Sequence, residues 1–381
     1  MLESFLNAKP LYYDTIDYGR MPRIYASIKR ALPLPKIIHI IGTNGKGTTG
    51  RFIAAALYSF GVAVGHYTSP HILKFNERIW LNGSDVSDKE LEDAHQKLMQ
   101  LLKREDAEAL SYFEYTTLLA MVVYREMEYV VLEAGLGGEY DATAVFENVL
   151  TVVTPISIDH EAFLGDTIEE IAQTKLNAIQ KSAIVAKQPY KETLSVVKTV
   201  AEKRGVTIAF YKELLDDVIL QQIESIAKRA GLPNYLQENM SVAAAVIKKL
   251  GFTLDENSFK EGRLFGRASK IAENIIVDVG HNTLAATALC KTLLGKKFLL
   301  IYNSYSDKNY PEILKILAPI ISKVLLLEVN DSRIEKREIM QQNLQNLKIA
   351  YEDFKRLESD KEYLVFGSFS VVEAFLKGYN G

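Results

Sequence analysis

A strand-like segment, a glycine-rich turn and a helix-like segment follow one another directly between Ile37 and Leu57, and this unit limits the possible folds more than any other. The stretch reads IIHIIGTNGKGTTGRFIAAAL. Gly42, Gly45 and Gly47 let the backbone curl, so that its N–H groups can converge on phosphate oxygens at the start of the helix. The pattern therefore predicts an α/β fold with a phosphate site at the end of a strand.

The side chains of this turn suit a nucleotide and a metal ion. Lys46 can reach the outer phosphates, and the Thr48 hydroxyl is placed to ligate Mg²⁺. The predicted nucleotide-binding residues of the turn are Thr43, Asn44, Gly45, Lys46, Gly47 and Thr48. The alternative is a glycine-rich turn with an exposed lysine. We favour the nucleotide site, because the strand before the turn and the helix after it are the context that the motif requires.

Short β-branched runs alternate with helical stretches along most of the chain, which is typical of a parallel sheet covered by helices. The predicted strands are Lys36–Ile41, Ala63–Tyr67, Tyr129–Ala134, Val149–Ile156, Ala183–Ala186, Ile275–Val279, Lys297–Asn303, Lys323–Val329 and Tyr363–Phe366. Residues 251–270 contain two Gly-Arg pairs and little periodicity. We therefore predict two α/β domains, a larger one over residues 1–266 and a smaller one over residues 267–381.

Composition excludes several classes of protein. The 381 residues are 48% hydrophobic and 24% charged, which are globular proportions. A net charge of -3 lacks the basic excess of a nucleic-acid binder. The N-terminus does not resemble a signal peptide, and no run approaches the ~18 apolar residues of a membrane span. We expect a cytoplasmic protein that binds neither nucleic acid nor membranes.

Three further positions carry candidate chemistry. Glu133 ends an apolar strand, where α/β sheets bind ligands, and its carboxylate suits Mg²⁺; a lone glutamate there is otherwise a cap or a surface charge. His160 follows another apolar strand and by itself is more often structural. Lys175 lies on the apolar face of a helix that Thr167 and Glu170 begin with a capping-box pattern. Burial would favour its neutral amine, whereas the alternative is a lysine that extends to solvent.

The turn departs from the general P-loop pattern, and the departure indicates a family. Gly42 precedes Gly45 by three positions, and Gly47 stands between Lys46 and Thr48. This form resembles the ATP-dependent amide ligases of the Mur ligase superfamily, and GTNGKG is similar to folylpolyglutamate synthase and dihydrofolate synthase. The later segments TSPHILKFNERIWLNG, YVVLEAGLGGEYDATAV, SIDHEAFLGDT and IIVDVGHN support the resemblance in order. It implies a P-loop ATPase-like domain with a mostly parallel sheet, followed by a smaller Rossmann-like α/β domain.

The resemblance implies a metal site and a modified lysine. Mg²⁺ would be held by Thr48, Ser69, Glu133 and His160, although imidazole is an unusual ligand for this ion. Lys175, 15 residues after His160, would be carbamylated by CO₂ and would face a second ion as a carboxylate. The sequence around this lysine, TKLNA, departs from the Glu-Lys-Ala-Gly-Ile of the family.

The resemblance also assigns residues in and near the C-terminal part. Arg267, in a Gly-Arg linker, would contact an ATP phosphate from the second domain. Asp278, in an Asp-x-x-His-Asn motif, would bind the nucleotide, and His281 would lie beside the phosphates. Asn239 would contact adenine. The family's Trp-Pro before the linker is Leu264-Phe265 in this chain, so we expect different packing around the arginine.

Substrate-side residues follow from the same resemblance. Phe113 would stack on a pterin ring with Glu114 beside it, and Asp141 matches an aspartate that contacts the pterin. Arg23 matches the family pattern only loosely. The segment EYDATA differs from the family by a Glu for Arg, a Tyr for Leu and an Ala for Asn.

The implied reaction is the ATP-dependent joining of L-glutamate to dihydropteroate, to the γ-carboxylate of a folate, or to both, through an acyl phosphate. The expected cofactors are ATP, two Mg²⁺ ions and the carbamate, and Lys46, Lys175 and His281 would be catalytic. The expected partners are the small-molecule substrates dihydropteroate or a reduced folate, L-glutamate and ATP, and we expect a monomer. Another Mur-type ligase, a small-molecule kinase and a non-catalytic nucleotide switch are the alternatives, although Glu133 and the second domain argue against a kinase.

Overall fold

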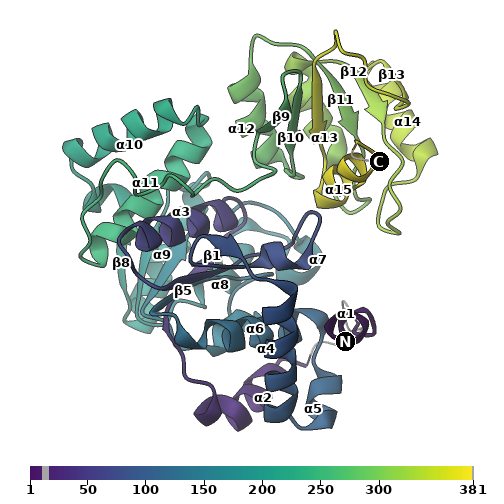
Figure 1. The fold of residues 1–381 in the computed structure, drawn as a ribbon. Helices are drawn as coiled ribbons and strands as arrows, with labels where there is room; N and C mark the ends of the chain where they lie inside the picture. The colour runs from purple at the N-terminus through teal and green to yellow at the C-terminus, as the bar shows by residue number, and fades with distance from the viewer. Residues whose placement is uncertain (11–16, 380–381) are drawn as a thin grey trace. The chain divides into compact units, whose positions relative to one another are not determined.

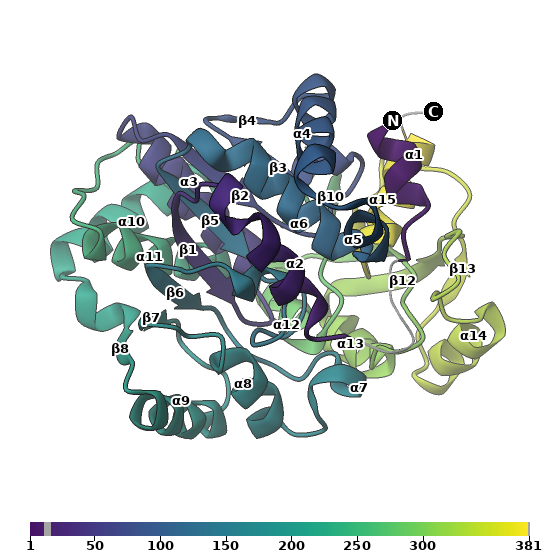
Figure 2. The same cartoon turned by 90° about the horizontal axis from the view of Figure 1, so that it is seen from below.

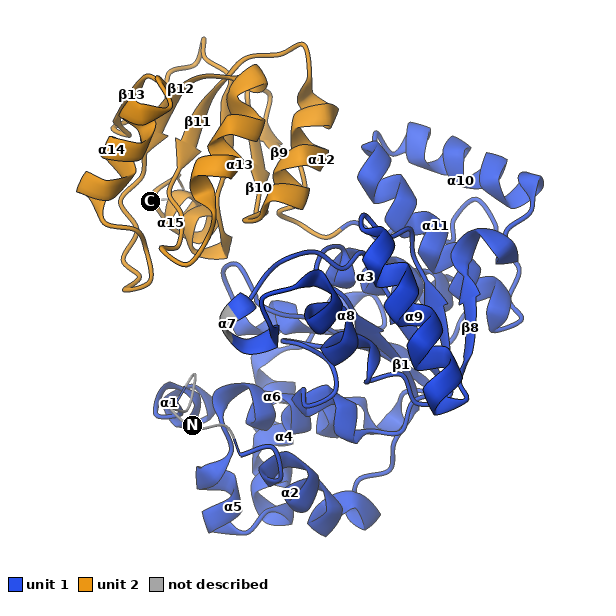
Figure 3. Ribbon diagram, turned by 180° about the vertical axis from the view of Figure 1, so that it is seen from behind, with its two compact units in different colours: residues 1–263 blue, residues 264–381 orange. Residues whose placement is uncertain are grey.

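The computed structural model of the protein describes residues 1–10 and 17–379. The chain divides into two compact units, Met1–Arg263 and Leu264–Gly381, which Figure 3 colours separately. The division falls close to the domain boundary expected at residue 266. Each unit holds one sheet with helices against it, and the predicted α/β class is confirmed.

The described part of unit 1 is built on an eight-stranded sheet with the order β4-β3-β2-β5-β1-β6-β7-β8 (Figure 1). Its strands are β1 (Lys36–Ile41), β2 (Val64–Tyr67), β3 (Ile79–Leu81), β4 (Ser84–Asp85), β5 (Tyr129–Glu133), β6 (Leu150–Val153), β7 (Ser182–Val185) and β8 (Thr207–Phe210). From β2 to β8 the neighbouring strands pair in parallel, while β3 and β4 form an antiparallel hairpin beside β2. The hairpin turns at Asn82-Gly83, where both residues have positive φ, as this dipeptide predicts.

The central strands are mostly apolar because helices cover both faces of the sheet. Along β1, Ile38 and Ile40 point to one face, and Ile37 and Ile41 point to the other; all four are buried. The five strands predicted for this part of the chain are confirmed, with ends that shift by up to three residues.

The helices of unit 1 form two layers, one on each face of the sheet. They are α1 (Leu2–Asn7), α2 (Arg20–Ile28), α3 (Lys46–Ser59), α4 (Asp88–Leu101), α5 (Arg104–Ala109), α6 (Tyr112–Val123), α7 (Glu161–Leu164), α8 (Ile168–Leu176), α9 (Lys191–Arg204), α10 (Asp217–Arg229) and α11 (Asn234–Lys249). Short 3₁₀ helices occupy Lys29–Ala31, Phe75–Arg78, Tyr124–Glu126, Ala142–Val145 and Tyr211–Leu214. No helix in the part of the chain that the structure describes is long and apolar enough to cross a membrane.

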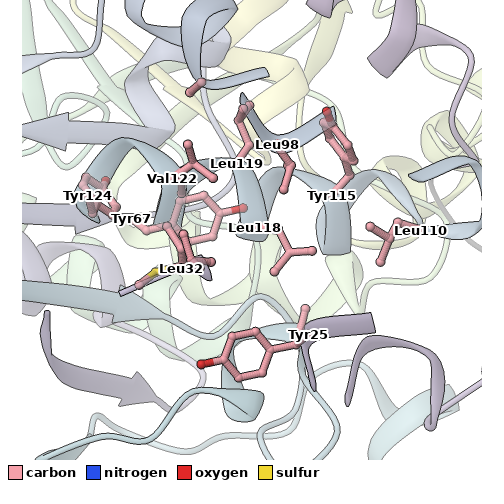
Figure 4. Close-up of a cluster of buried hydrophobic side chains, with 14 of the residues drawn as sticks. Tyr25, Leu32, Tyr67, Leu98, Leu110, Tyr115, Leu118, Leu119, Val122 and Tyr124 are labelled. Atoms are coloured by element: carbon pink, nitrogen blue, oxygen red, sulfur yellow. The ribbon is translucent and has the colours of Figure 1, made fainter. Parts of the chain in front are cut away.

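Three apolar clusters join these helices to the central strands. On one face, α3 and α11 share a core that includes Phe52 and Val242. On the other face, α2, α4 and α6 pack over β2 and β5 (Figure 2), and Figure 4 shows Tyr67 of β2 among side chains such as Leu118 and Val122 of α6. The second face continues under α8 and α9 in a separate cluster. The sheet is thus held between helices, and its carboxyl edge stays available for a site.

The described part of unit 2 is a six-stranded sheet with the order β13-β12-β11-β14-β10-β9, parallel except for β9. Its strands are β9 (Ser269–Ala272), β10 (Ile275–Asp278), β11 (Phe298–Tyr302), β12 (Ile321–Leu326), β13 (Tyr351–Asp353) and β14 (Tyr363–Phe366). Its helices are α12 (Thr283–Leu293), α13 (Tyr310–Leu317), α14 (Arg337–Asn346), α15 (Phe369–Tyr379) and the 3₁₀ helix Ala318–Ile320. A core around Leu300, Leu314 and Phe366 belongs to this unit.

Candidate active site

The carboxyl ends of four neighbouring strands bring most predicted site residues of unit 1 to one edge of its sheet. Because the order is β2-β5-β1-β6, the segments after these strands lie next to one another: residues 68–69, 133–141, 42–48 and 154–160. Ligands of open α/β sheets bind at this edge.

The glycine-rich turn is held against the segment that follows β6. The N–H groups of Thr43 and Asn44 both donate to the carbonyl oxygen of Pro155, at 2.9 and 3.1 Å. The Thr43 hydroxyl accepts from the N–H of Ser157 at 3.0 Å and donates to its carbonyl oxygen at 3.1 Å. We expected the N–H groups of the turn to point to phosphate, whereas those of Thr43 and Asn44 are bound to Pro155. The N–H groups suited to an anion are those of the first turn of α3, which have no acceptor within the helix.

Two glycines of the turn permit close approaches. Gly42 has a φ of +139°, and a Cβ there would lie 2.1 Å from Oγ1 of Thr154. Gly45 precedes α3 with a φ of +83°, and a Cβ there would lie 2.7 Å from Oδ1 of Asn239. Asn239, predicted to contact adenine, thus lies on α11 directly beside the turn.

Lys46 and Thr48 lie in the first turn of α3. The Lys46 ammonium donates to the carbonyl oxygens of Gly42 and Thr43 at 3.3 Å each, and its Nζ is 4.0 Å from Oε1 of Glu133. Thr48 is 2% exposed, and its hydroxyl has no hydrogen-bond partner among the described residues. A buried hydroxyl without a partner is costly, so this oxygen suits a ligand atom.

Glu133, the last residue of β5, is 4% exposed. The Thr68 hydroxyl donates to its Oε2, and the Ser69 N–H donates to the same oxygen at 3.4 Å. We expected Ser69 to serve this site, whereas Thr68 was not expected and makes the closer contact. Its position directly after β2 was the available signal, since the carboxyl ends of β2 and β5 are neighbours.

His160 lies at the N-terminus of α7 with a φ of 57°, and its side chain is 41% exposed. Its N–H donates to Oδ1 of Asp159 at 3.0 Å, and its Nε2 is 4.0 Å from that oxygen. Within residues 1–10 and 17–379, no three His, Cys, Asp or Glu side chains are grouped so that they could hold a metal ion.

Lys175 is buried beneath the glycine-rich turn. It is 4% exposed, and its Nζ donates to the carbonyl oxygen of Gly42 at 3.1 Å. The predicted capping box of Thr167 and Glu170 begins α8, and Lys175 lies on the buried face of that helix, as expected.

The surroundings of Lys175 favour its neutral form. Burial, followed by the charge of Lys46, lowers the pKa of Lys175 to about 7, while Asp159 and Asp141 oppose the change. The lowered pKa favours the neutral amine far more than in a solvated lysine, which suits a nucleophile.

The loop after β5 closes over α8 and supports Phe113. A Cβ at Gly138 would lie 2.5 Å from the carbonyl oxygen of Lys175, and one at Gly135 would lie 2.6 Å from Cζ of Phe113. The ring of Phe113 thus packs on the backbone of this loop. Phe113 lies in the first turn of α6, which accounts for its position beside residues that are distant in sequence.

Asp141 orders the same loop. Its Oδ1 accepts from the N–H and the hydroxyl of Thr143 at 2.9 and 2.5 Å, and its Oδ2 accepts from the N–H of Leu136 at 2.9 Å. Burial raises its pKa. The carboxylate expected to contact a pterin therefore holds its own loop in shape.

An arginine of α2 that was not among the predicted site residues, Arg20, pairs with the predicted Glu114. Arg20 forms a bidentate contact with Glu114, at 2.9 and 3.0 Å to Oε2 and 3.2 Å to Oε1, and both side chains are nearly buried. Glu114 also accepts from the N–H of Ser111 at 2.8 Å. Arg23 is 64% exposed and lies 3.8 Å from Asp17. The predicted Arg23 and Glu114 are therefore not brought together.

In unit 2 the predicted residues lie around the carboxyl end of β10. Asp278 is 5% exposed and accepts from the N–H groups of Ala268 and Gly280 at 2.8 Å each. The guanidinium of Arg267 lies 5.3 Å from the ring centre of Phe369 and donates to the carbonyl oxygen of Gly266 at 3.1 Å. His281 Nδ1 is 3.1 Å from the carbonyl oxygen of Val279. Arg267 and Asp278 thus flank one strand end.

Comparison with known proteins decides the family. A search against protein-family models returned no match. The chain is 30% identical to a dihydrofolate synthase/folylpolyglutamate synthase of Haemophilus influenzae, an alignment that covers 96% of this chain and 94% of the relative. The chain belongs to the dihydrofolate synthase/folylpolyglutamate synthase family. The predicted family and the predicted class of enzyme, an ATP-dependent ligase, are confirmed.

Solved structures of folylpolyglutamate synthases have the same fold. The Helicobacter pylori folylpolyglutamate synthetase is 37% identical to this chain and superposes with a TM-score of 0.81. The alignment covers 100% of this chain and 98% of the synthetase. Escherichia coli FolC in complex with DHPP and ADP is 26% identical over 99% of this chain and 96% of its own, also with a TM-score of 0.81. A Yersinia pestis folylpolyglutamate synthase/dihydrofolate synthase complexed with AMPPNP and a Mn ion shares the fold at 22% identity and a TM-score of 0.81, covering 100% of this chain and 97% of its own.

Proposed function

We propose that this enzyme joins the amine of L-glutamate to the carboxylate of dihydropteroate, to the γ-carboxylate of a folate, or to both. The observation that carries the proposal is the convergence of Lys46, Glu133 and Lys175 on the glycine-rich turn at one sheet edge. A substrate carboxylate would attack the γ-phosphorus of ATP, ADP would leave, and the glutamate amine would displace phosphate from the acyl phosphate. Such a reaction depends on positioning and on neutralisation of phosphate charge.

Lys46 and the N-terminus of α3 would bind the phosphates. The Lys46 ammonium is held over the turn by two carbonyl oxygens, so little side-chain freedom is lost when phosphate binds. Asn239, which abuts Gly45, would contact adenine. The ADP in the related Escherichia coli complex supports nucleotide binding by this chain.

The donor atoms fit a divalent metal ion of the Mg²⁺ type. The buried hydroxyl of Thr48, which has no partner in the described part of the chain, and the buried carboxylate of Glu133 are hard oxygen donors. Thr48, Ser69, Glu133 and His160 would hold the ion, and a second ion would lie near modified Lys175. When bound, Mg²⁺ would neutralise charge on the phosphates.

Lys175 is proposed to carry a carbamate. Its neutral amine nitrogen would attack the carbon of CO₂, and loss of the nitrogen's proton would leave a carboxylate on the side chain. The pKa of about 7 supports this step, because the nucleophile is abundant at neutral pH. We expect Lys175→Ala to lose most activity and to recover part of it with a short-chain carboxylate. An active variant would contradict the carbamate.

Unit 2 would supply Arg267, Asp278 and His281 to the nucleotide, with Arg267 on a phosphate. The stacking of its guanidinium on Phe369 supports a fixed direction for this side chain. Arg267→Ala should raise KM for ATP at unchanged melting temperature.

The pteroate side would be formed by Phe113 and the loop that ends at Asp141. The ring of Phe113 and the hydrogen-bonded carboxylate are held by the same loop, which supports one rigid pocket wall. Glu114 would act through its buried pair with Arg20, and Arg23 would contribute least. We propose a cytoplasmic monomer whose partners are its small-molecule substrates.

A glutamate-dependent ADP-release assay with dihydropteroate, tetrahydrofolate and a cell-wall nucleotide precursor in parallel tests the proposal. We expect ADP release with at least one of the two pterin substrates, and only when glutamate is present. ADP release with the cell-wall precursor alone, or phosphate transfer to a hydroxyl acceptor, would contradict it.

A further inference from the structure

A glutamine outside the predicted site is tied to the backbone that holds the glycine-rich turn. Gln188 follows β7, and its side chain is half-buried. Its Oε1 accepts from the N–H of Ile156 at 2.9 Å, and its Nε2 donates to the carbonyl oxygens of Thr154 at 3.3 Å and Ala186 at 3.0 Å. The first two contacts lie on either side of Pro155.

Planarity of the peptide bond transmits this contact to the turn. The carbonyl of Pro155 and the N–H of Ile156 belong to one peptide plane and point in opposite directions. Gln188 holds the N–H of this plane, and the oxygen on its other side accepts from both Thr43 and Asn44. A rotation of this plane would release both N–H groups of the turn at once.

The preceding peptide plane is fixed in the same way. Its carbonyl belongs to Thr154 and accepts from Nε2 of Gln188. Thr154 is also the residue against which Gly42 packs without room for a Cβ. One side-chain amide therefore fixes both planes around Pro155, and with them the backbone of residues 42–44.

We propose that Gln188 is a positioning residue for ATP: by holding the peptide planes around Pro155, it keeps the glycine-rich turn in its nucleotide-binding shape. The inference rests on the proposed function, since it assumes that this turn binds ATP. The three hydrogen bonds of the Gln188 amide all go to backbone atoms, so its effect on the reaction would be indirect.

The chain contains a matched control at the opposite ends of the same two strands. Gln180 precedes β7; its Oε1 accepts from the N–H of Asn148 at 3.0 Å, and its Nε2 donates to the carbonyl oxygens of Phe146 at 3.0 Å and Ala144 at 3.3 Å. These hydrogen bonds match those of Gln188 in number, in type and closely in length. Substitution of either glutamine should therefore lower the stability of the fold to a similar extent. Only substitution of Gln188 should disturb the glycine-rich turn.

The test compares Gln188→Met with Gln180→Met in the full chain. Methionine keeps the length of the side chain and removes the amide. The measurements are the denaturant midpoint, the affinity for MgADP by calorimetry, and KM and kcat with respect to ATP and glutamate. We expect both midpoints to fall to a similar extent. Gln188→Met should lose about tenfold in MgADP affinity and in kcat/KM for ATP, with KM for glutamate unchanged, while Gln180→Met keeps the wild-type affinity.

Equal losses of MgADP affinity in the two variants, or wild-type affinity in Gln188→Met, would overturn the proposal. If Gln188→Met does not fold, Gln188→Glu and Gln180→Glu are compared by the same criterion, since glutamate keeps an oxygen for the backbone N–H. Failure of the proposed function would give a different result. The wild-type enzyme would then bind MgADP but would show no glutamate-dependent turnover.

Discussion

Replacement of Lys175 by methionine should stabilise the fold, and the size of the gain should depend on pH. A solvated lysine has a pKa of 10.5, whereas burial lowers that of Lys175 to about 7. At 1.36 kcal/mol per pKa unit, this difference destabilises the wild-type fold by roughly 4 kcal/mol at pH 7. Loss of the hydrogen bond to Gly42 offsets about 1–2 kcal/mol of the gain. We expect Lys175→Met to be more stable by roughly 2–3 kcal/mol at pH 7.

The pH dependence of this stability difference shows whether the lowered pKa of Lys175 causes it. Between pH 7 and 10.5 the unfolded state binds more protons than the folded state, so the stability of the wild type rises with pH. The advantage of the variant should therefore shrink by roughly 2 kcal/mol between pH 7 and pH 9. Denaturant unfolding in CO₂-free buffer measures both values. Lys181→Met, which removes a lysine that is 58% exposed, serves as the control and should show no such trend. A constant advantage, or a less stable variant at both pH values, would refute the reasoning.

Three further predictions concern neighbouring residues. Thr48→Val should keep its melting temperature and lose most kcat/KM for ATP, whereas Thr49→Val, which also removes a buried hydroxyl without a partner in the described chain, should keep its activity. Arg20→Ala breaks a nearly buried ion pair and should lower the free energy of unfolding by about 3 kcal/mol in urea; exposed Arg23→Ala should change it by less than ~0.5 kcal/mol. Gly42→Ala cannot fit its Cβ and should abolish MgADP binding in calorimetry, and retained binding would contradict the geometry.

The part of the fold that follows from local pattern could be predicted from the sequence. The central strands are mostly apolar, so β1, β5 and β14 are recognised with almost correct ends. The strands β8, β9 and β13 were not expected, because they are short and partly exposed and lack a distinctive pattern. Their place depends on neighbours that lie far away in the sequence.

Some residues of the candidate site could likewise be predicted from the sequence, and others could not. Glu133 is recognisable as a carboxylate at the end of an apolar strand, and Lys175 as a charged residue on the apolar face of a helix. Both are buried beside the turn. The contacts of Arg20 and of Gln188 with residues 154 and 156 could not be predicted, since they join segments 32 or more residues apart and follow no spacing rule. These contacts are a product of the strand order, which the sequence pattern alone does not specify.

The fate of the substrate's carboxylate oxygen shows whether the reaction passes through an acyl phosphate. Dihydropteroate, or a folate if that is the substrate used, is labelled with the heavy oxygen isotope in the reacting carboxylate and incubated with ATP, Mg²⁺ and L-glutamate, and the released phosphate is analysed by mass spectrometry. If the enzyme forms an acyl phosphate that glutamate displaces, each phosphate carries one labelled oxygen. Phosphate without label, or label in AMP, would contradict this account.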